Sequence, residues 1–116
     1  MDLIERARYQ QCLWWALLGT DFSHTASYAP AVTIACRWQY KSQRIEDASG
    51  VTRLSRVYLM PDRQLSVGDL VWGPGTAFPG STTNPQAADT PALQIVKVET
   101  LNTIDGDDTF YEAWAV

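Results

Sequence analysis

Hydrophobic and polar residues alternate along much of this chain with a period of two, which is the pattern of a half-buried β-strand. The clearest run covers residues 31–41, and Pro30 precedes it, where a missing backbone N–H costs no ladder bond. The run predicts a strand, and because Trp38 lies on its apolar face we expect that side chain to be buried. The apolar face consists of Val32, Ile34, Cys36, Trp38 and Tyr40.

Segments rich in β-branched and aromatic residues predict further strands at residues 9–17, 53–60, 69–72, 92–100 and 109–115. Turn-forming sequences stand between them, such as Asp-Ala-Ser-Gly before the second long strand and Asp-Gly before the last one. Residues 93–101 are apolar on both faces at their centre, which indicates a central strand. We therefore expect an all-β, mostly antiparallel protein, either a small β-barrel or a sandwich with long loops.

The N-terminal residues allow two interpretations. Leu3, Ile4 and Ala7 share one helical face, so residues 2–8 form either a short helix or a frayed end. The adjacent Trp14 and Trp15 fall within the strand predicted after them. Because side chains alternate along a strand, one of these tryptophans is expected to face the core and the other to face outward.

Residues 73–91 form a long connection of unusual composition. They contain three glycines, four prolines, four threonines and a single charged residue, Asp89. Structureless loops longer than about 15 residues are uncommon in compact domains and are usually functional or disordered. This segment is therefore either an arm that orders against a neighbouring molecule or a mobile surface loop.

The amino-acid composition limits the classes of protein to which the chain can belong. The chain has 116 residues, of which 46% are hydrophobic and 11% aromatic, enough to fill one core. We expect a single domain over residues 1–116 rather than a disordered chain. No apolar run approaches the roughly 18 residues of a membrane helix, and no signal peptide is visible at the N-terminus. Synthesis in the cytoplasm is expected.

The net charge of -4 argues against tight, general binding to nucleic acid. Basic residues nevertheless concentrate in the middle of the chain, where acidic residues interrupt them. The pattern indicates a surface of mixed charge rather than a uniformly basic one. The basic residues are Arg37, Lys41, Arg44, Arg53, Arg56 and Arg63, and the acidic residues are Glu46, Asp47 and Asp62.

Residues that usually carry catalysis or bind metals occur here without their characteristic spacing. The chain has no nucleophile-elbow, phosphate-loop, dinucleotide-binding or zinc-protease motif. Cys12 and Cys36 lack the spacing of a zinc site and are interpreted as buried thiols, and His24 is the only histidine. Acidic residues near Asp105 resemble the start of a calcium loop, but Glu112 falls at the wrong spacing, so a hairpin turn is preferred. No catalytic residue, cofactor or metal site is predicted, and the chain is not expected to be an enzyme.

Several short sequences follow one another in a recognisable order. They are CLWW, GTDF, YAP, VTIACRW, SRVYLMPD, SVGDLVW and LQIVKVETL. Over about residues 9–116, this order resembles the small head-closure proteins of tailed bacteriophages, also called stoppers or head–tail joining proteins. The chain departs from the family at residues 73–91, which are longer and richer in proline and threonine than the resemblance leads us to expect.

The resemblance implies a barrel-like or sandwich-like subunit of a ring that lies below the portal and adaptor proteins of the virion. Such a ring, a hexamer or a dodecamer, keeps packaged DNA inside the capsid and docks the tail proteins, without contact to a membrane. Two alternatives stay open at this point. One is a tail-terminator or tail-completion ring protein, and the other is a small β-barrel module that binds an oligonucleotide or a carbohydrate.

Two sets of residues are candidates for function in such a ring. The hairpin tip over residues 40–53 is expected to be polar and flexible, and it is either a gate that touches DNA or an ordinary solvated hairpin end. Its charged residues are Lys41, Arg44, Glu46, Asp47 and Arg53. The candidates for contacts between subunits are Trp14, Trp15, Phe78 and Pro79.

Overall fold

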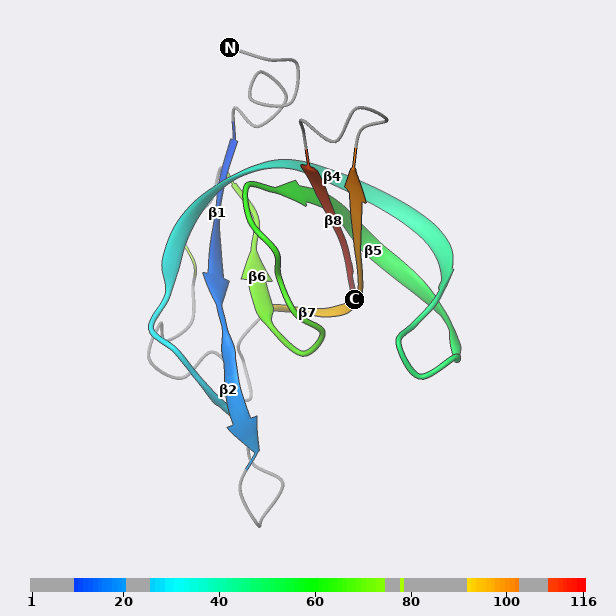
Figure 1. Cartoon of the computed structure of the whole chain (residues 1–116), viewed down its shortest axis with the longest axis horizontal. Helices are drawn as coiled ribbons and strands as arrows, with labels where there is room; N and C mark the ends of the chain where they lie inside the picture. The colour runs from blue at the N-terminus through cyan, green and yellow to red at the C-terminus, as the bar shows by residue number, and fades with distance from the viewer. Residues whose placement is uncertain (1–9, 21–25, 75–77, 79–91, 103–108) are drawn as a thin grey trace.

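The structure, a computed structural model, describes residues 10–20, 26–74, 78, 92–102 and 109–116. Regular structure within these ranges is entirely β, which confirms the expected class (Figure 1). Within the ranges described there is no helix that is long and apolar enough to cross a membrane. The interpretation of residues 2–8 lies outside the described residues. The strands are β1 (Gln10–Trp15), β2 (Leu17–Thr20), β3 (Ala26–Tyr28), β4 (Val32–Glu46), β5 (Thr52–Pro61), β6 (Leu70–Trp72), β7 (Leu93–Asn102) and β8 (Thr109–Ala115).

Six of these strands close into an antiparallel barrel. Their order around it is β1, β4, β5, β8, β7 and β6, and β6 pairs again with β1. The registers fix the closure, because Cys12 of β1 lies opposite Ile34 of β4 while Leu13 lies opposite Trp72 of β6. The C-terminal strand β8 lies between β5 and β7, as expected of a terminal strand inside the sheet. Of the two architectures predicted, the barrel is the one observed.

Side chains from all six barrel strands fill one core. Trp38 is 6% exposed, which confirms the expectation from the sequence. Large side chains of β5 meet small ones of β8, since Leu59 lies opposite Ala113 in the register. The core consists of Cys12, Ile34, Cys36, Trp38, Val57, Leu59, Leu65, Val71, Ile95, Ala113 and Ala115.

Strand β4 is longer than its hydrophobic pattern predicts. The alternation predicts an end at residue 41, but β4 continues to Glu46. A shift of register between Tyr40 and Gln43 marks a bulge, after which the buried side chain is Ile45 rather than one at an even position. Tyr40 itself is 76% exposed. The sequence pattern fails here because an extra residue reverses the phase of the alternation.

The single strand predicted over residues 9–17 is divided in two. β1 ends at Trp15, and the backbone N–H of Leu17 donates a 2.8 Å hydrogen bond to the side chain of Asp69 rather than to a neighbouring strand. β2 and β3 pair with each other and with no barrel strand, so they form a separate β2–β3 arm. Figure 1 shows β2 continuing from β1 and extending away from the barrel.

Candidate functional site

The second half of β4 and the first half of β5 form a two-stranded ribbon, the β4–β5 ribbon (residues 40–46 and 52–57). Ile45 is buried on the face that the ribbon turns toward the barrel. On the opposite face Arg44 lies directly across from Leu54, and both side chains are exposed. The ribbon is therefore held to the barrel on one side and presents the other side to solvent.

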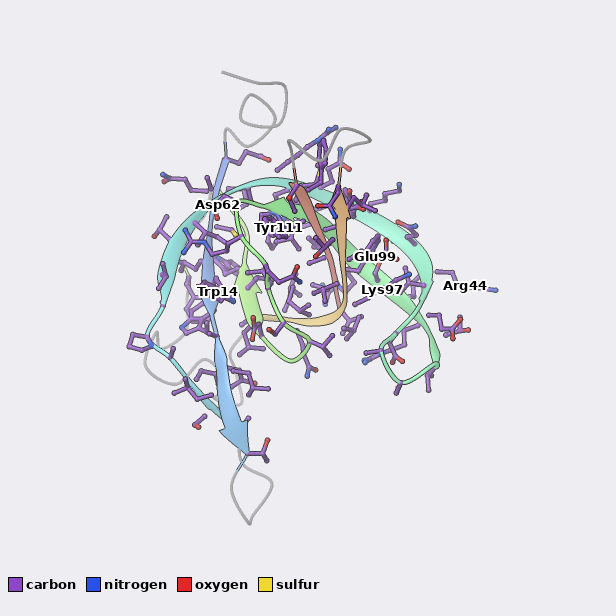
Figure 2. All side chains as sticks on the ribbon, in the orientation of Figure 1. Trp14, Arg44, Asp62, Lys97, Glu99 and Tyr111 are labelled. Carbon is purple, nitrogen blue, oxygen red and sulfur yellow. The ribbon has the colours of Figure 1, made fainter. Side chains whose placement is uncertain are left out.

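The exposed side chains of the ribbon are predominantly basic, with Glu46 as an exposed carboxylate among them. Lys41, Arg44 and Arg56 are all exposed, and none of them forms an ion pair within the part of the chain that the structure describes. Arg44 points away from the barrel into solvent in Figure 2. Arg53 differs from them, because its guanidinium lies 3.8 Å from the carboxylate of Asp47. Three cations are thus left available to an anionic partner.

The turn between β4 and β5 is held by the side chain of Asp47. Its carboxylate accepts hydrogen bonds from the Ser49 hydroxyl at 2.7 Å and from the backbone N–H groups of Ser49 and Val51 at 3.0 Å. The bond from the Ser49 hydroxyl is the main cause that holds the pKa of Asp47 below its usual range. The backbone N–H of Ala48 also donates a 3.2 Å hydrogen bond to the carbonyl of Val96 on β7. The turn is therefore fixed both internally and to the barrel.

The hairpin tip expected over residues 40–53 is shorter in the structure, because only residues 47–51 lie outside the two strands. Lys41, Arg44, Glu46 and Arg53 lie on strands, and the pairing of β4 with β5 resumes after the bulge and continues to Glu46 and Thr52. The structure nevertheless brings these residues together along one ribbon, so the expected surface of mixed charge is present.

The aromatic candidates for subunit contacts divide between the core and the surface. Trp15 is fully buried and its ring lies 4.8 Å from that of Phe78, which in turn lies 5.6 Å from Trp72. Trp15 is therefore the tryptophan of the pair that faces the core, and within the described chain it offers no exposed surface to a neighbouring subunit. Trp14 is half-buried, packs against the core and donates to Asp69, so it is less exposed than the alternation predicts. Pro79 lies outside the described residues.

Asp69 is a buried carboxylate that sequence reasoning missed. It is 2% exposed and accepts hydrogen bonds from Trp14 Nε1 at 2.9 Å, from Leu17 N–H at 2.8 Å and from Ser66 N–H at 2.9 Å. It also adds to the effect of burial in raising the pKa of Tyr28 on β3. Asp69 therefore fixes the base of the β2–β3 arm to the barrel. The sequence offered only the Gly-Asp pair within SVGDLVW, and the strand predicted over residues 69–72 already included Asp69.

Cys12 and Cys36 are buried free thiols on the neighbouring strands β1 and β4, which confirms their interpretation. A hydrogen bond from the Cys12 thiol to Cys36 raises the pKa of Cys12, and burial adds to that effect. The same hydrogen bond lowers the pKa of Cys36. The two thiols are thus close enough to interact, a point that the sequence left open.

One end of the barrel contains a pocket of about 320 Å³, here called the mouth pocket. It lies where β6 ends and β7 begins, and β4 and β5 supply its opposite wall. Sequence reasoning did not bring these residues together, because they come from four strands and the residue after one of them. The lining residues are Trp38, Tyr40, Arg56, Trp72, Gly73 and Leu93.

Across the residues that the structure describes, no three His, Cys, Asp or Glu side chains gather closely enough to hold a metal ion. His24 and Asp105 lie outside those residues. No protein-family model matches the chain, and no curated protein matches its sequence. Function is therefore inferred from the order of sequence landmarks and from the surfaces of the molecule.

Proposed function

We propose that this chain is a head-closure subunit of a tailed bacteriophage, a structural protein that forms a ring at the head–tail junction of the virion. In this role it contacts copies of itself, the portal or adaptor proteins above, the tail proteins below and the DNA in the channel. No catalytic step and no cofactor belong to the role. The proposal is supported by the order of sequence landmarks from CLWW to LQIVKVETL. The structural observation that carries it is the β2–β3 arm.

The β2–β3 arm has the properties of a contact between subunits. Strands that close into a barrel offer little free edge for pairing, so contacts to a neighbour come from elements outside the barrel. The arm pairs with no barrel strand and exposes 68% of Leu18. Asp69 fixes its base through Leu17. A fixed direction is what a contact repeated around a closed ring requires.

The β4–β5 ribbon has the properties of a surface that faces a DNA channel. Lys41, Arg44 and Arg56 attract phosphate groups, whereas Glu46 and Asp47 stand at the far end of the ribbon. DNA has to leave through such a ring, and strong attraction to its phosphates would slow that exit. Mixed charge on the ribbon, together with the net charge of -4, favours contact without tight binding.

The experiment that tests the proposal removes the apolar contact of the arm. The variant Leu18→Ser is expected to fold as the unsubstituted chain does, because exposed positions contribute little to stability. It is expected not to bind DNA-filled, tailless heads of the phage in whose genome the chain is encoded. Binding is measured by co-sedimentation with the heads, and DNA retention is measured by sensitivity to nuclease.

Leu101→Ser is the matched control, because Leu101 is also an exposed leucine but lies on β7 of the barrel. This variant is expected to bind the heads normally. Failure of the unsubstituted chain to bind the heads or to protect their DNA would overturn the proposed function. Normal binding of Leu18→Ser would instead remove the arm as the contact between subunits.

A further inference from the structure

The mouth pocket has the size and position of a ligand site. Pockets that bind small ligands usually measure about 300–1,000 Å³, and the mouths of β-barrels are one of their common locations. The pocket of about 320 Å³ lies at such a mouth, with the buried Trp38 as part of its wall. No residue of the proposed arm contact lines it, so the pocket is a separate feature of the molecule.

Aromatic rings make up much of the wall. The rings of Trp38 and Tyr40 lie 6.0 Å apart at 74°, which leaves the exposed Tyr40 ring standing at the edge of the pocket. Trp72 contributes a half-buried indole from β6. Flat aromatic faces of this kind stack well with planar rings, and nucleobases are planar whatever their sequence.

The polar groups of the wall are chiefly hydrogen-bond donors. The Nε1–H of Trp38 is buried and has no hydrogen-bond partner within the described chain. A Cβ at Gly73 would lie 2.9 Å from that nitrogen, so the backbone of Gly73 packs closely against it. The guanidinium of Arg56 is exposed and forms no ion pair within the same residues. Indole and guanidinium donate but do not accept, so a ligand that completes this site has to bring acceptors.

The charged side chains near the pocket determine which ligands with hydrogen-bond acceptors are favoured. Lys41 and Arg44 follow Tyr40 along the ribbon and are exposed without ion-pair partners in the described part of the chain. The acidic Asp47 at the far end of the ribbon is paired with Arg53. Glu46, two residues beyond Arg44, is exposed as well. Arg56 lines the pocket and Lys41 adjoins Tyr40 in the sequence, so the charges nearest the pocket are positive and favour a ligand with negative charge.

We propose that the mouth pocket binds an unpaired nucleotide of a single-stranded nucleic acid. The base lies against the rings of Tyr40 and Trp72, and a phosphate lies on Arg56 with the next phosphates along Lys41 and Arg44. A small shift of the backbone at Gly73 brings an acceptor of the base to the Trp38 N–H, which gives that donor its missing partner. This binding does not depend on the ring, because the pocket lies within one chain.

The test is binding of a fluorescein-labelled ten-nucleotide oligodeoxythymidine to the purified chain, followed by anisotropy at several salt concentrations. We expect saturable binding that weakens with salt as phosphate contacts require. A blunt duplex of the same length is expected to bind at least tenfold more weakly, because its bases are stacked inside the helix. An oligouridine of equal length separates DNA from RNA preference, and either preference agrees with the proposal.

Three variants report on the pocket. Trp38→Phe removes the unpartnered N–H but keeps a ring, Arg56→Gln removes the cation, and Tyr40→Ala removes an exposed stacking face. Each is expected to weaken binding at least fivefold. Arg63→Gln is the matched control for charge, because Arg63 is paired with Asp62 outside the pocket.

Trp114→Phe is the control for loss of an indole, because its Nε1 donates to Gln43 outside the pocket. Both controls are expected to stay within twofold of the unsubstituted chain. Absence of binding would overturn the proposal, as would equal affinity for single strand and duplex or equal losses in Arg63→Gln and Arg56→Gln. Tighter binding of an uncharged proline-containing peptide in the pocket would also overturn it. If Trp38→Phe fails to fold, the two variants at exposed positions, Tyr40→Ala and Arg56→Gln, decide the outcome.

Discussion

Asp69 shows how much a single buried carboxylate contributes to the arrangement of two elements. Its three donors are Trp14 Nε1, Leu17 N–H and Ser66 N–H. Hydrogen bonds to a charged acceptor typically contribute about 1.5–3 kcal/mol each to stability. The variant Asp69→Ala leaves all three donors without an acceptor. We expect the free energy of unfolding to fall by about 3 kcal/mol or more, as measured by urea denaturation.

Glu99→Ala is the control for this loss of charge, because Glu99 forms an exposed ion pair with Lys97 at 3.5 Å. Exposed pairs contribute up to about 1 kcal/mol, so its effect is expected to be small. Equal losses in the two variants would show that Asp69 contributes no more than a surface charge does.

The close approach of Gly73 to the indole of Trp38 limits the size of the side chain at each of the two positions. A Cβ at residue 73 would lie 2.7 Å from Cε2 of Trp38, so Gly73→Ala is expected to cost about 1–3 kcal/mol through overpacking. Trp38→Ala is expected to cost about 3–5 kcal/mol, because it leaves a cavity in the core. In the double variant the space left by the indole admits the new methyl group, so the two costs should not add. Strict additivity in urea denaturation would contradict a direct contact.

Residues of the core were predictable from the sequence, whereas the polar anchor was not. Burial of Trp38, Cys12 and Cys36 follows from apolar side chains within regular alternation, which is a local property of the chain. Asp69 gave no comparable signal, because two of its partners lie 52 and 55 positions away in the sequence. Partners at such a distance become visible only once the barrel has closed.

At the scale of elements, the hairpin of β4 and β5 shows where a periodic pattern stops being informative. The alternation located β4 but ended it at residue 41, because the bulge after Tyr40 moves the buried positions to odd numbers. A template of strict period two cannot follow such a change of phase. The error also assigned Lys41 and Arg44 to a flexible tip when they lie on a strand.

The turn of this hairpin is expected to weaken in acid. The folded-state pKa of Asp47 is lowered, first by the hydrogen bond from the Ser49 hydroxyl, so its charged form stabilises the fold. Such a contribution is fully present above the unfolded-state pKa of about 4 and is lost as the pH falls through the lower folded-state value. Asp47→Ala is therefore expected to be less stable than the unsubstituted chain at neutral pH, and the difference should shrink below about pH 4.

Urea denaturation of both chains across this pH range measures the difference. Glu46→Ala on the adjacent strand position controls for the loss of one carboxylate from the ribbon. A difference between Asp47→Ala and the unsubstituted chain that stays constant with pH would mean that the charge of Asp47 does not hold the turn.

For the whole molecule, the all-β fold class and most strands were predictable from the sequence, but the closure of the sheet into a barrel was not. Period-two strands satisfy a sandwich and a barrel equally well, and the pattern does not say which strands become neighbours. Here the three-residue strand β6 decides between them, because it pairs with both β1 and β7. The mouth pocket was hidden from the sequence for the same reason, since its walls meet only after closure. Of residues 73–91 the structure describes only 73, 74 and 78, so the arm expected there stays a prediction.

If the chain is the proposed head-closure subunit, retention of DNA by its ring tests the β4–β5 ribbon. Lys41 and Arg44 are exposed on a ribbon whose other face holds it to the barrel, so their replacement should leave the fold intact. We expect heads closed with the double variant Lys41→Ala/Arg44→Ala to attach tails normally. Before tail attachment, however, they should lose DNA faster than heads closed with the unsubstituted chain, because two phosphate contacts per subunit are absent. Release of nuclease-sensitive DNA over time measures this loss.

Arg37→Ala/Arg63→Ala removes the same amount of charge from other exposed positions and is expected to retain DNA. Leakage in both double variants would mean that net charge, rather than the ribbon, holds the DNA. Normal retention with Lys41→Ala/Arg44→Ala would show that the ribbon does not contact the DNA in the closed head. Because the ribbon is fixed to β7 through Ala48 and Val96, it is expected to restrain DNA by position and charge rather than by moving as a flexible gate.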